Sequence, residues 1–168
     1  NTSVSFCKTS GIITADKYVS YVGGLIGQAV TNSNINKCSS AATVIGWFQV
    51  GGLLGRTDDG TVSNCFATGN VSNYQGGGQY CGGLIGLSSS TKIENSYALG
   101  DVSGNVSAGG LIGSFYNSSS IITNSYAKGM VSCNSSNCGG RWGGLVGECV
   151  FEPTIKDSYW NSTVNANP

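Results

Sequence analysis

The sequence predicts an all-β fold, a β-solenoid similar to a parallel β-helix, with about five to six coils of roughly 30 residues each. Three observations predict it. A glycine-rich phrase occurs five times at a nearly regular interval. A second phrase lies between these copies. It is rich in β-branched residues and flanked by Gly, Asn and Ser, which predicts short strands separated by turns. No segment has the i, i+3, i+4 apolar spacing of an amphipathic helix.

The glycine-rich phrase reads Gly-Gly-Leu, then Ile, Leu or Val, then Gly, and its copies begin at Gly23, Gly51, Gly82, Gly109 and Gly143. Glycine is expected where φ is positive or where the backbone passes close to another group, so the doubled glycine predicts a tight corner. We expect the leucines of the phrase to stack in single file inside a dry core. These leucines are Leu25, Leu53, Leu84, Leu111 and Leu145.

The second phrase aligns in six segments, which are 4–13, 35–44, 62–71, 93–102, 122–131 and the shorter 155–161. Val or Ile fills the first column, Asn dominates the third, Cys or Ser fills the fourth, and an aromatic residue usually follows. If one repeat makes one coil, equivalent residues lie about 4.8 Å apart. The third column then predicts a ladder of Asn amides at a bend, through Asn64, Asn95 and Asn124. The fifth predicts stacked rings, inside or outside, at Phe66, Tyr97, Tyr126 and Tyr159.

The whole chain, residues 1–168, is expected to be one repeat-built domain. Extra residues concentrate at 73–80 and 133–141, which predicts loops on one side of the solenoid, often the side that meets partners. The chain begins and ends within the repeat pattern, so we expect a segment excised from a longer product.

Composition argues against several classes of function. Eight Lys and Arg balance eight Asp and Glu, so there is no basic stripe to hold nucleic acid. No run of eighteen apolar residues predicts a membrane span, and the first residues do not have the pattern expected of a signal peptide.

Seven cysteines indicate an oxidising compartment, and their odd number leaves at least one without an intramolecular partner. Cys133 and Cys138 bracket a short insertion and are the first candidates for a disulfide. Cys7, Cys38 and Cys65 share one column, where the coil spacing permits a bridge between one pair. The alternative for these three is a role as small buried side chains, replaced by Ser in later coils.

Six Asn-x-Ser/Thr sequons are candidates for glycosylation if the source has a eukaryotic secretory pathway. They begin at Asn1, Asn70, Asn105, Asn117, Asn134 and Asn161. Their placement in turns and insertions favours glycans on the flanks of the solenoid.

No catalytic site is predicted. The chain has no His, which excludes Ser-His-Asp and Cys-His catalysis and His-zinc sites. A polysaccharide-cleaving β-helix requires carboxylates clustered on one face. The carboxylates of this chain do not share a column, so no such cluster is predicted. The Asp-Asp-Gly sequence at 58–60 is expected to be a turn rather than a Ca²⁺ site. Near Arg141, we expect a surface charge pair that involves Glu148 and Glu152. We therefore expect no enzyme, no metal and no cofactor.

Two kinds of non-enzymatic binding surface are compatible with a solenoid of this composition. Exposed aromatic residues could stack on sugar rings, although packing in the core or at the rim is the alternative for each of them. They are Trp47, Tyr74, Tyr80 and Trp142. An ice-binding face is disfavoured, because the threonines are scattered rather than arrayed.

The paired phrases, best seen in residues 82–102, resemble the GLUG motif repeat. The resemblance covers almost the whole chain. It implies a β-solenoid from a large secreted or surface-attached protein, such as an adhesin-like chain or the non-catalytic part of an immunoglobulin A peptidase. It carries over no catalytic residues. This chain departs from typical copies in its cysteines, in the two insertions and in the weaker phrase at 35–44.

Solenoid ends expose unpaired strand edges, and no capping helix is predicted. We therefore expect these edges to pair with another chain. The leading hypothesis is a structural subunit of an extracellular fibril or cell-surface appendage that associates with itself end to end. Residues 1–5 or 164–168 are expected to contribute to the junction. The alternative is a monomeric adhesin-like or glycan-binding surface module, and an enzyme ranks third.

Overall fold

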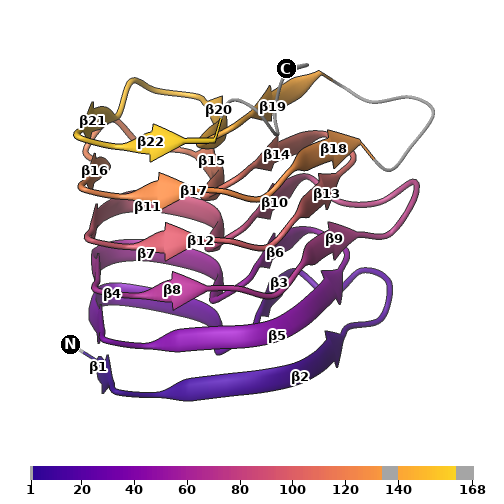
Figure 1. The fold of residues 1–168 in the computed structure, drawn as a ribbon, viewed down its shortest axis with the longest axis horizontal. Helices are drawn as coiled ribbons and strands as arrows, with labels where there is room; N and C mark the ends of the chain where they lie inside the picture. Colours follow the sequence, from indigo (N-terminus) through magenta and orange to yellow (C-terminus); the bar gives the residue numbers. More distant parts are fainter. Residues whose placement is uncertain (1, 134–139, 162–168) are drawn as a thin grey trace.

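The computed structural model describes residues 2–133 and 140–161 and confirms a parallel β-solenoid with about 31 residues per turn. The chain rises in coils from the N-terminal end to the C-terminal end (Figure 1). The strand pairs of the described residues are parallel, and equivalent positions of successive repeats pair with each other. The backbone N–H of each repeated leucine donates to the carbonyl of the next, at 2.8–2.9 Å, from Leu25 through to Leu145. The predicted single file is confirmed.

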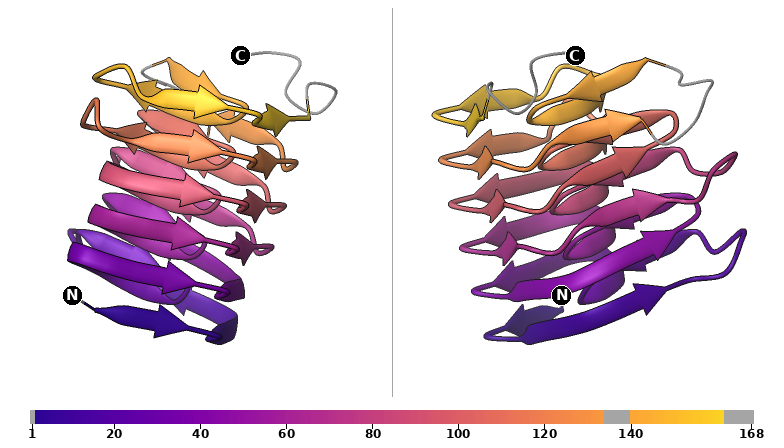
Figure 2. Two further views of the ribbon diagram at one scale, coloured as in Figure 1. Left: turned by 90° about the vertical axis from the view of Figure 1, so that its left-hand side faces the viewer. Right: turned by 45° about the vertical axis from the view of Figure 1, so that its right-hand side comes forward.

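Each coil passes through three sheets in turn (Figure 2). The first sheet contains β1 (Ser3–Ser5), β4 (Ile26–Asn36), β7 (Leu54–Ser63), β11 (Ile85–Glu94), β15 (Ile112–Phe115), β16 (Ile121–Thr123), β20 (Val146–Cys149) and β21 (Thr154–Lys156). The second sheet contains β2 (Lys8–Thr14), β5 (Ser39–Gly46), β8 (Phe66–Ala67), β9 (Val71–Asn73), β12 (Tyr97–Ala98), β13 (Val102–Gly104), β17 (Tyr126–Ala127), β18 (Val131–Cys133) and β22 (Tyr159–Trp160). The third sheet contains β3 (Tyr21–Gly23), β6 (Gln49–Gly51), β10 (Tyr80–Gly82), β14 (Ser107–Gly109) and β19 (Arg141–Gly143).

Two apolar clusters run along the solenoid axis. The larger one joins the Leu column, exemplified by Leu84, to the first-column side chains such as Ile93 and to the small residues of the second sheet such as Ala98. The smaller one joins the second and third sheets through Val44, Val50 and their equivalents. Each column is buried because the coils above and below cover it, so burial depends on stacking.

The doubled glycines are required because other atoms lie too close to leave space for a side chain, and not because of their backbone angles. None of them has a positive φ; among the described glycines the positive values occur at Gly11, Gly60, Gly76, Gly78 and Gly140. A Cβ on Gly83 would overlap the carbonyl oxygen of Gly110 and lie 2.8 Å from the Cβ of Ala98. The corner therefore brings the backbone against the small-residue column of the second sheet, where a larger side chain has no space.

The Cys or Ser column holds the bend between the first and second sheets. The side chain donates to the carbonyl two residues earlier, as Ser96 Oγ does to Glu94 at 2.7 Å. It also accepts the backbone N–H of the equivalent residue in the preceding coil, as Ser96 Oγ does from Cys65 at 3.1 Å. Cys65 Sγ accepts the N–H of Cys38 in the same way at 3.4 Å. The column therefore selects a small side chain that both donates and accepts a hydrogen bond, which Cys and Ser share.

Replacement of Ser96 by Ala is expected to lower the free energy of unfolding by about 1–3 kcal/mol, because the buried N–H of Cys65 loses its acceptor. Urea denaturation monitored by circular dichroism measures the change. Ser96→Cys is the matched control, since Cys occupies the same column in three earlier coils. Equal losses for both variants would contradict the role assigned to the hydrogen bonds.

The Asn column adopts the left-handed backbone predicted for a bend. Asn64, Asn95 and Asn124 have φ of 55°, 48° and 50°. The amide of Asn124 donates to Asn95 Oδ1 at 3.3 Å, whereas Asn64 donates to Asn36, one residue before the column, at 3.0 Å. The predicted ladder is therefore confirmed for the step from Asn95 to Asn124, whereas the Asn64 amide bonds to a residue outside the column. The bend is a property of the coil, since the departing residues of the column share the positive φ: Phe6, Lys37 and Asp157.

Candidate functional site

The aromatic column forms a stack of rings on the outer side of the second sheet. The rings of Phe66 and Tyr97 stack at 4.9 Å between centroids, and those of Tyr97 and Tyr126 at 5.0 Å, with interplanar angles of 3° and 9°. Tyr126 is exposed, so the predicted ladder lies outside. Because each face within the stack is covered by its neighbour, sugar rings cannot stack on the faces between coils.

The other aromatic residues proposed for sugar binding are all partly buried. Trp47 contacts Tyr18 at 5.2 Å and Tyr74 at 6.4 Å between ring centroids, while the Lys17 ammonium lies 5.9 Å from its ring. A Cβ on Gly77 would lie only 2.5–2.6 Å from Trp47 ring atoms, so this glycine packs against the indole. Trp47 therefore belongs to rim packing around the 73–80 insertion.

A depression adjoins this aromatic cluster, lined by Trp47, Phe48, residues 76–78, Gln79, Asn105 and Val106. The Asn105 amide donates to the backbone carbonyls of Tyr74 and Gly77 and thereby joins the turn of one coil to the insertion of the coil below. Asn105 is 5% exposed, so the folded structure leaves no room for the glycan predicted at this sequon.

The remaining sequons differ in their surroundings. Asn70 is exposed, and its Oδ1 accepts the backbone N–H of Asp101 at 3.0 Å. Asn117 is partly exposed within a turn, where its Oδ1 accepts the N–H of Ser119 at 3.0 Å. Asn161 is partly exposed at the end of the described chain. Asn1 and Asn134 lie outside the described residues, and glycosylation stays a prediction at the five positions other than Asn105.

The cysteine column contains free thiols. Cys7, Cys38 and Cys65 are not bridged in the structure, so the disulfide that their spacing permits is not formed. The alternative prediction, small buried side chains, describes Cys38 and Cys65, and burial raises the pKa of the Cys65 thiol to about 11. Burial also raises the pKa of Cys81. Such thiols stay protonated at neutral pH and are poor nucleophiles. Cys138 lies outside the described residues, and its disulfide with Cys133 stays a prediction.

Charged side chains pair locally instead of converging. Arg56 Nε lies 2.7 Å from Asp58 Oδ2, and Arg141 Nη1 lies 2.7 Å from Glu148 Oε1. The predicted charge pair therefore involves Glu148, while Asp58 is held by a neighbouring arginine. Within residues 2–133 and 140–161, no group of three potential metal ligands was found. That part of the chain also contains no helix of the length and apolarity needed to cross a membrane.

The two ends of the solenoid expose columns that are buried in its middle. In the first column, Ile93 and Ile122 are 0% exposed, whereas Ile155 in the last coil is 42% exposed. At the other end, Val4 and Ile13 are only partly buried, whereas their partners in the next coil, Ile35 and Val44, are buried. Among the described strands, β21 pairs only with β16 and β2 only with β5. Each end therefore combines a strand edge with part of the apolar core.

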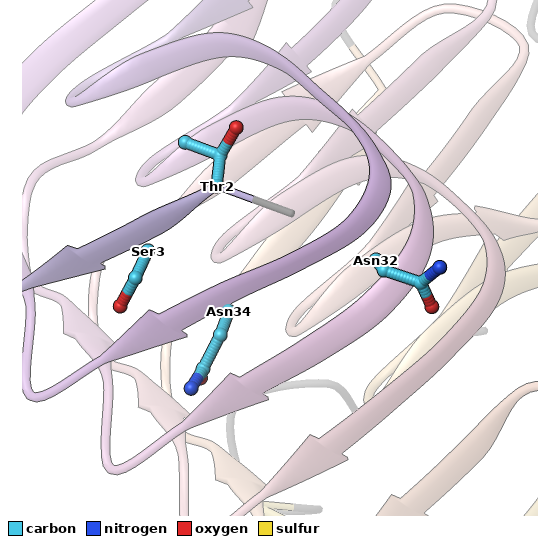
Figure 3. Close-up of a pocket in the computed structure, with 4 residues that line it drawn as sticks. All are labelled: Thr2, Ser3, Asn32 and Asn34. Carbon is cyan, nitrogen blue, oxygen red and sulfur yellow. The ribbon is translucent and has the colours of Figure 1, made fainter.

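The N-terminal end also carries a shallow polar depression, lined by Thr2, Ser3, Asn32 and Asn34 (Figure 3). Ser3 and Asn34 are register partners on neighbouring strands, and Asn34 N–H donates to the carbonyl of Thr2 at 2.8 Å. Asn32, with φ of 52°, belongs to the bulge between Val30 and Ser33. Hydroxyl and amide groups therefore border the apolar columns at this end. The exposed ends were predicted from the repeat architecture, whereas no sequence motif indicated this depression.

Stacked parallel coils, repeated ladders and two exposed ends define a repeat-built β-solenoid. Residues 18–45 and 48–72 match the GLUG motif. The chain is thus a β-solenoid with two matches to the GLUG motif, in the part of the sequence where the resemblance implied such repeats.

Its fold is similar to the crystal structure of a putative immunoglobulin A1 protease from Bacteroides ovatus. The TM-score is 0.68 and the sequence identity 22%, over 94% of this chain and 57% of that chain. The chain therefore corresponds to little more than half the length of the bacterial structure, and the likeness concerns the fold. No curated protein sequence matches the chain.

Proposed function

We propose that this chain is a non-enzymatic structural module of an extracellular fibril or cell-surface appendage, and that its copies stack end to end. One observation carries the proposal: the first-column side chain Ile155 is 42% exposed at the C-terminal end, whereas its equivalents inside the stack are fully buried. An exposed core column beside an unpaired strand edge is a surface that another coil of the same cross-section can cover. The extracellular setting is supported by the sequons at the surface.

Light scattering after size-exclusion chromatography and electron microscopy over a concentration series test the proposal. The 168-residue chain is expected to form linear oligomers whose length grows with concentration. Ile155→Lys should weaken association by about a hundredfold or more, because stacking would bury an unpaired charge. Leu99→Lys is the matched control, since Leu99 lies on the flank and is already partly exposed. A chain that stays monomeric at every concentration and ionic strength would overturn the proposal.

A second candidate is a glycan-binding module, favoured by the depression beside Trp47. Phe48 and Val106 offer apolar surface there, and Gln79 offers an amide, with no charged residue in the lining. A glycan array tests this function on the monomeric and the assembled protein. Phe48→Ala should abolish any glycan signal, while Tyr116→Ala, which removes an exposed ring elsewhere, should leave it unchanged. An array without signal rejects this candidate.

A further inference from the structure

We infer that the solenoid ends join in a single register, in which β21 and β22 of one copy lie against β1 and β2 of the next and Ser158 lies directly below Cys7. This inference rests on the proposed end-to-end assembly and specifies its interface. It follows from the hydrogen bonds that recur at the bend of every coil.

The bend carries three recurring hydrogen bonds between successive coils. The N–H of the left-handed residue donates upward to a carbonyl, as from Asn95 to Thr123 at 3.1 Å. The N–H of the Cys or Ser residue donates upward to the equivalent side chain, as from Ser96 to Ser125 Oγ at 3.2 Å. The N–H two residues after the left-handed residue donates downward, as from Tyr126 to the carbonyl of Ser96 at 3.1 Å.

The last and first coils hold the two halves of the same set. In the last coil, the N–H groups of Asp157 and Ser158 occupy the positions that donate upward, beyond the last described coil. In the first coil, the Ser5 carbonyl and the Cys7 side chain occupy the positions that accept from below, while Lys8 N–H occupies the position that donates downward. A second copy in register supplies all three bonds. From the lower copy, Asp157 N–H donates to the Ser5 carbonyl and Ser158 N–H donates to Cys7 Sγ of the upper copy. From the upper copy, Lys8 N–H donates to the Ser158 carbonyl of the lower copy.

The same register joins the apolar and aromatic columns. Val4 pairs with Ile35 inside the chain and Ile155 pairs with Ile122, so the register places Val4 above Ile155 and covers both. Tyr159 ends the aromatic column and is 67% exposed. The register places Lys8 above it, where the ammonium can lie over the ring, as Lys37 Nζ lies 5.2 Å from the Phe6 ring within the chain. A slip of one residue would turn these side chains to the wrong face.

Disulfide trapping tests the register. Ser158→Cys in a Cys149→Ser background places a thiol directly below Cys7 of the next copy. Cys is native to this column in three coils, so the substitution suits the bend. Lys156→Cys in the same background is the matched control, because two residues along a strand move the thiol by about 6.6 Å. Both variants are oxidised with copper phenanthroline, the linked peptides are identified by mass spectrometry, and circular dichroism verifies folding.

The Ser158→Cys thiol is expected to form an intermolecular disulfide with Cys7 about tenfold or more faster than the Lys156→Cys thiol, because the register raises its effective concentration. Linear assemblies without this preference would overturn the register and leave the proposed function standing. Absence of assembly in the unmodified chain would overturn both.

Discussion

Replacement of Gly83 by Ala is expected to destabilise the solenoid by more than about 3 kcal/mol. The added methyl group would overlap the Gly110 carbonyl oxygen of the next coil and press against Ala98. Backbone surrounds the site, so the clash can be relieved only by separating the coils, which also breaks the hydrogen bond from Gly83 N–H to Gly109 at 3.2 Å. Urea denaturation, or loss of soluble folded protein on expression, measures the effect.

Gly76→Ala provides the comparison for this prediction. Gly76 lies in the 73–80 insertion with no atom within 4 Å of an added Cβ, and its only constraint is a φ of 72°. The variant should lose only about 1–2 kcal/mol, the cost of a left-handed conformation for a residue with a side chain. If Gly83→Ala cost no more than Gly76→Ala, the corner would be looser than the structure describes.

Truncation of Leu84 to Ala is expected to lower the free energy of unfolding by about 2–5 kcal/mol. Leu84 is fully buried in the middle of the Leu column, between Leu53 and Leu111. The coils above and below are held by their backbone ladders, so they cannot collapse into the space, and the cavity adds to the lost transfer free energy. Thermal and urea unfolding measure the loss.

Leu99→Ala is the control for the core prediction. Leu99 has the same side chain but is 36% exposed on the flank. Its truncation should cost about 1 kcal/mol or less. Similar losses at Leu84 and Leu99 would mean that stability does not reside in the stacked column.

Much of the fold could be predicted from the sequence because a solenoid repeats its environment. Every coil meets the same neighbours, so each position selects the same residue type, and the Leu, Asn and aromatic columns are visible without coordinates. The position of the bend follows equally from Asn64, Asn95 and Asn124, which tolerate a left-handed backbone.

The candidate site was harder to predict, since it depends on exposure and contact rather than on residue type. Asn105 matches a sequon as well as Asn70 does, but only the packing of the 73–80 insertion buries it. The predicted junction at 1–5 and 164–168 is described in part: residues 2–5 lie at the N-terminal end, whereas Asn1 and residues 164–168 lie outside the described residues. The strands that end the described stack, β21 and β22, correspond to the truncated phrase at 155–161, but the exposure of their side chains is visible only in the structure.

The sequence by itself determined the parallel coil, its length and the identity of its columns, because residues one repeat apart experience the same surroundings. Only the tertiary structure decided why each column selects its residue type. It showed that the doubled glycines are required because the backbone of the next coil leaves no space for a Cβ. It also showed that Cys65 and Ser96 make the same hydrogen bond to the preceding coil. It also showed which columns reach solvent at the two ends. These properties arise from distances between coils, which no single repeat contains.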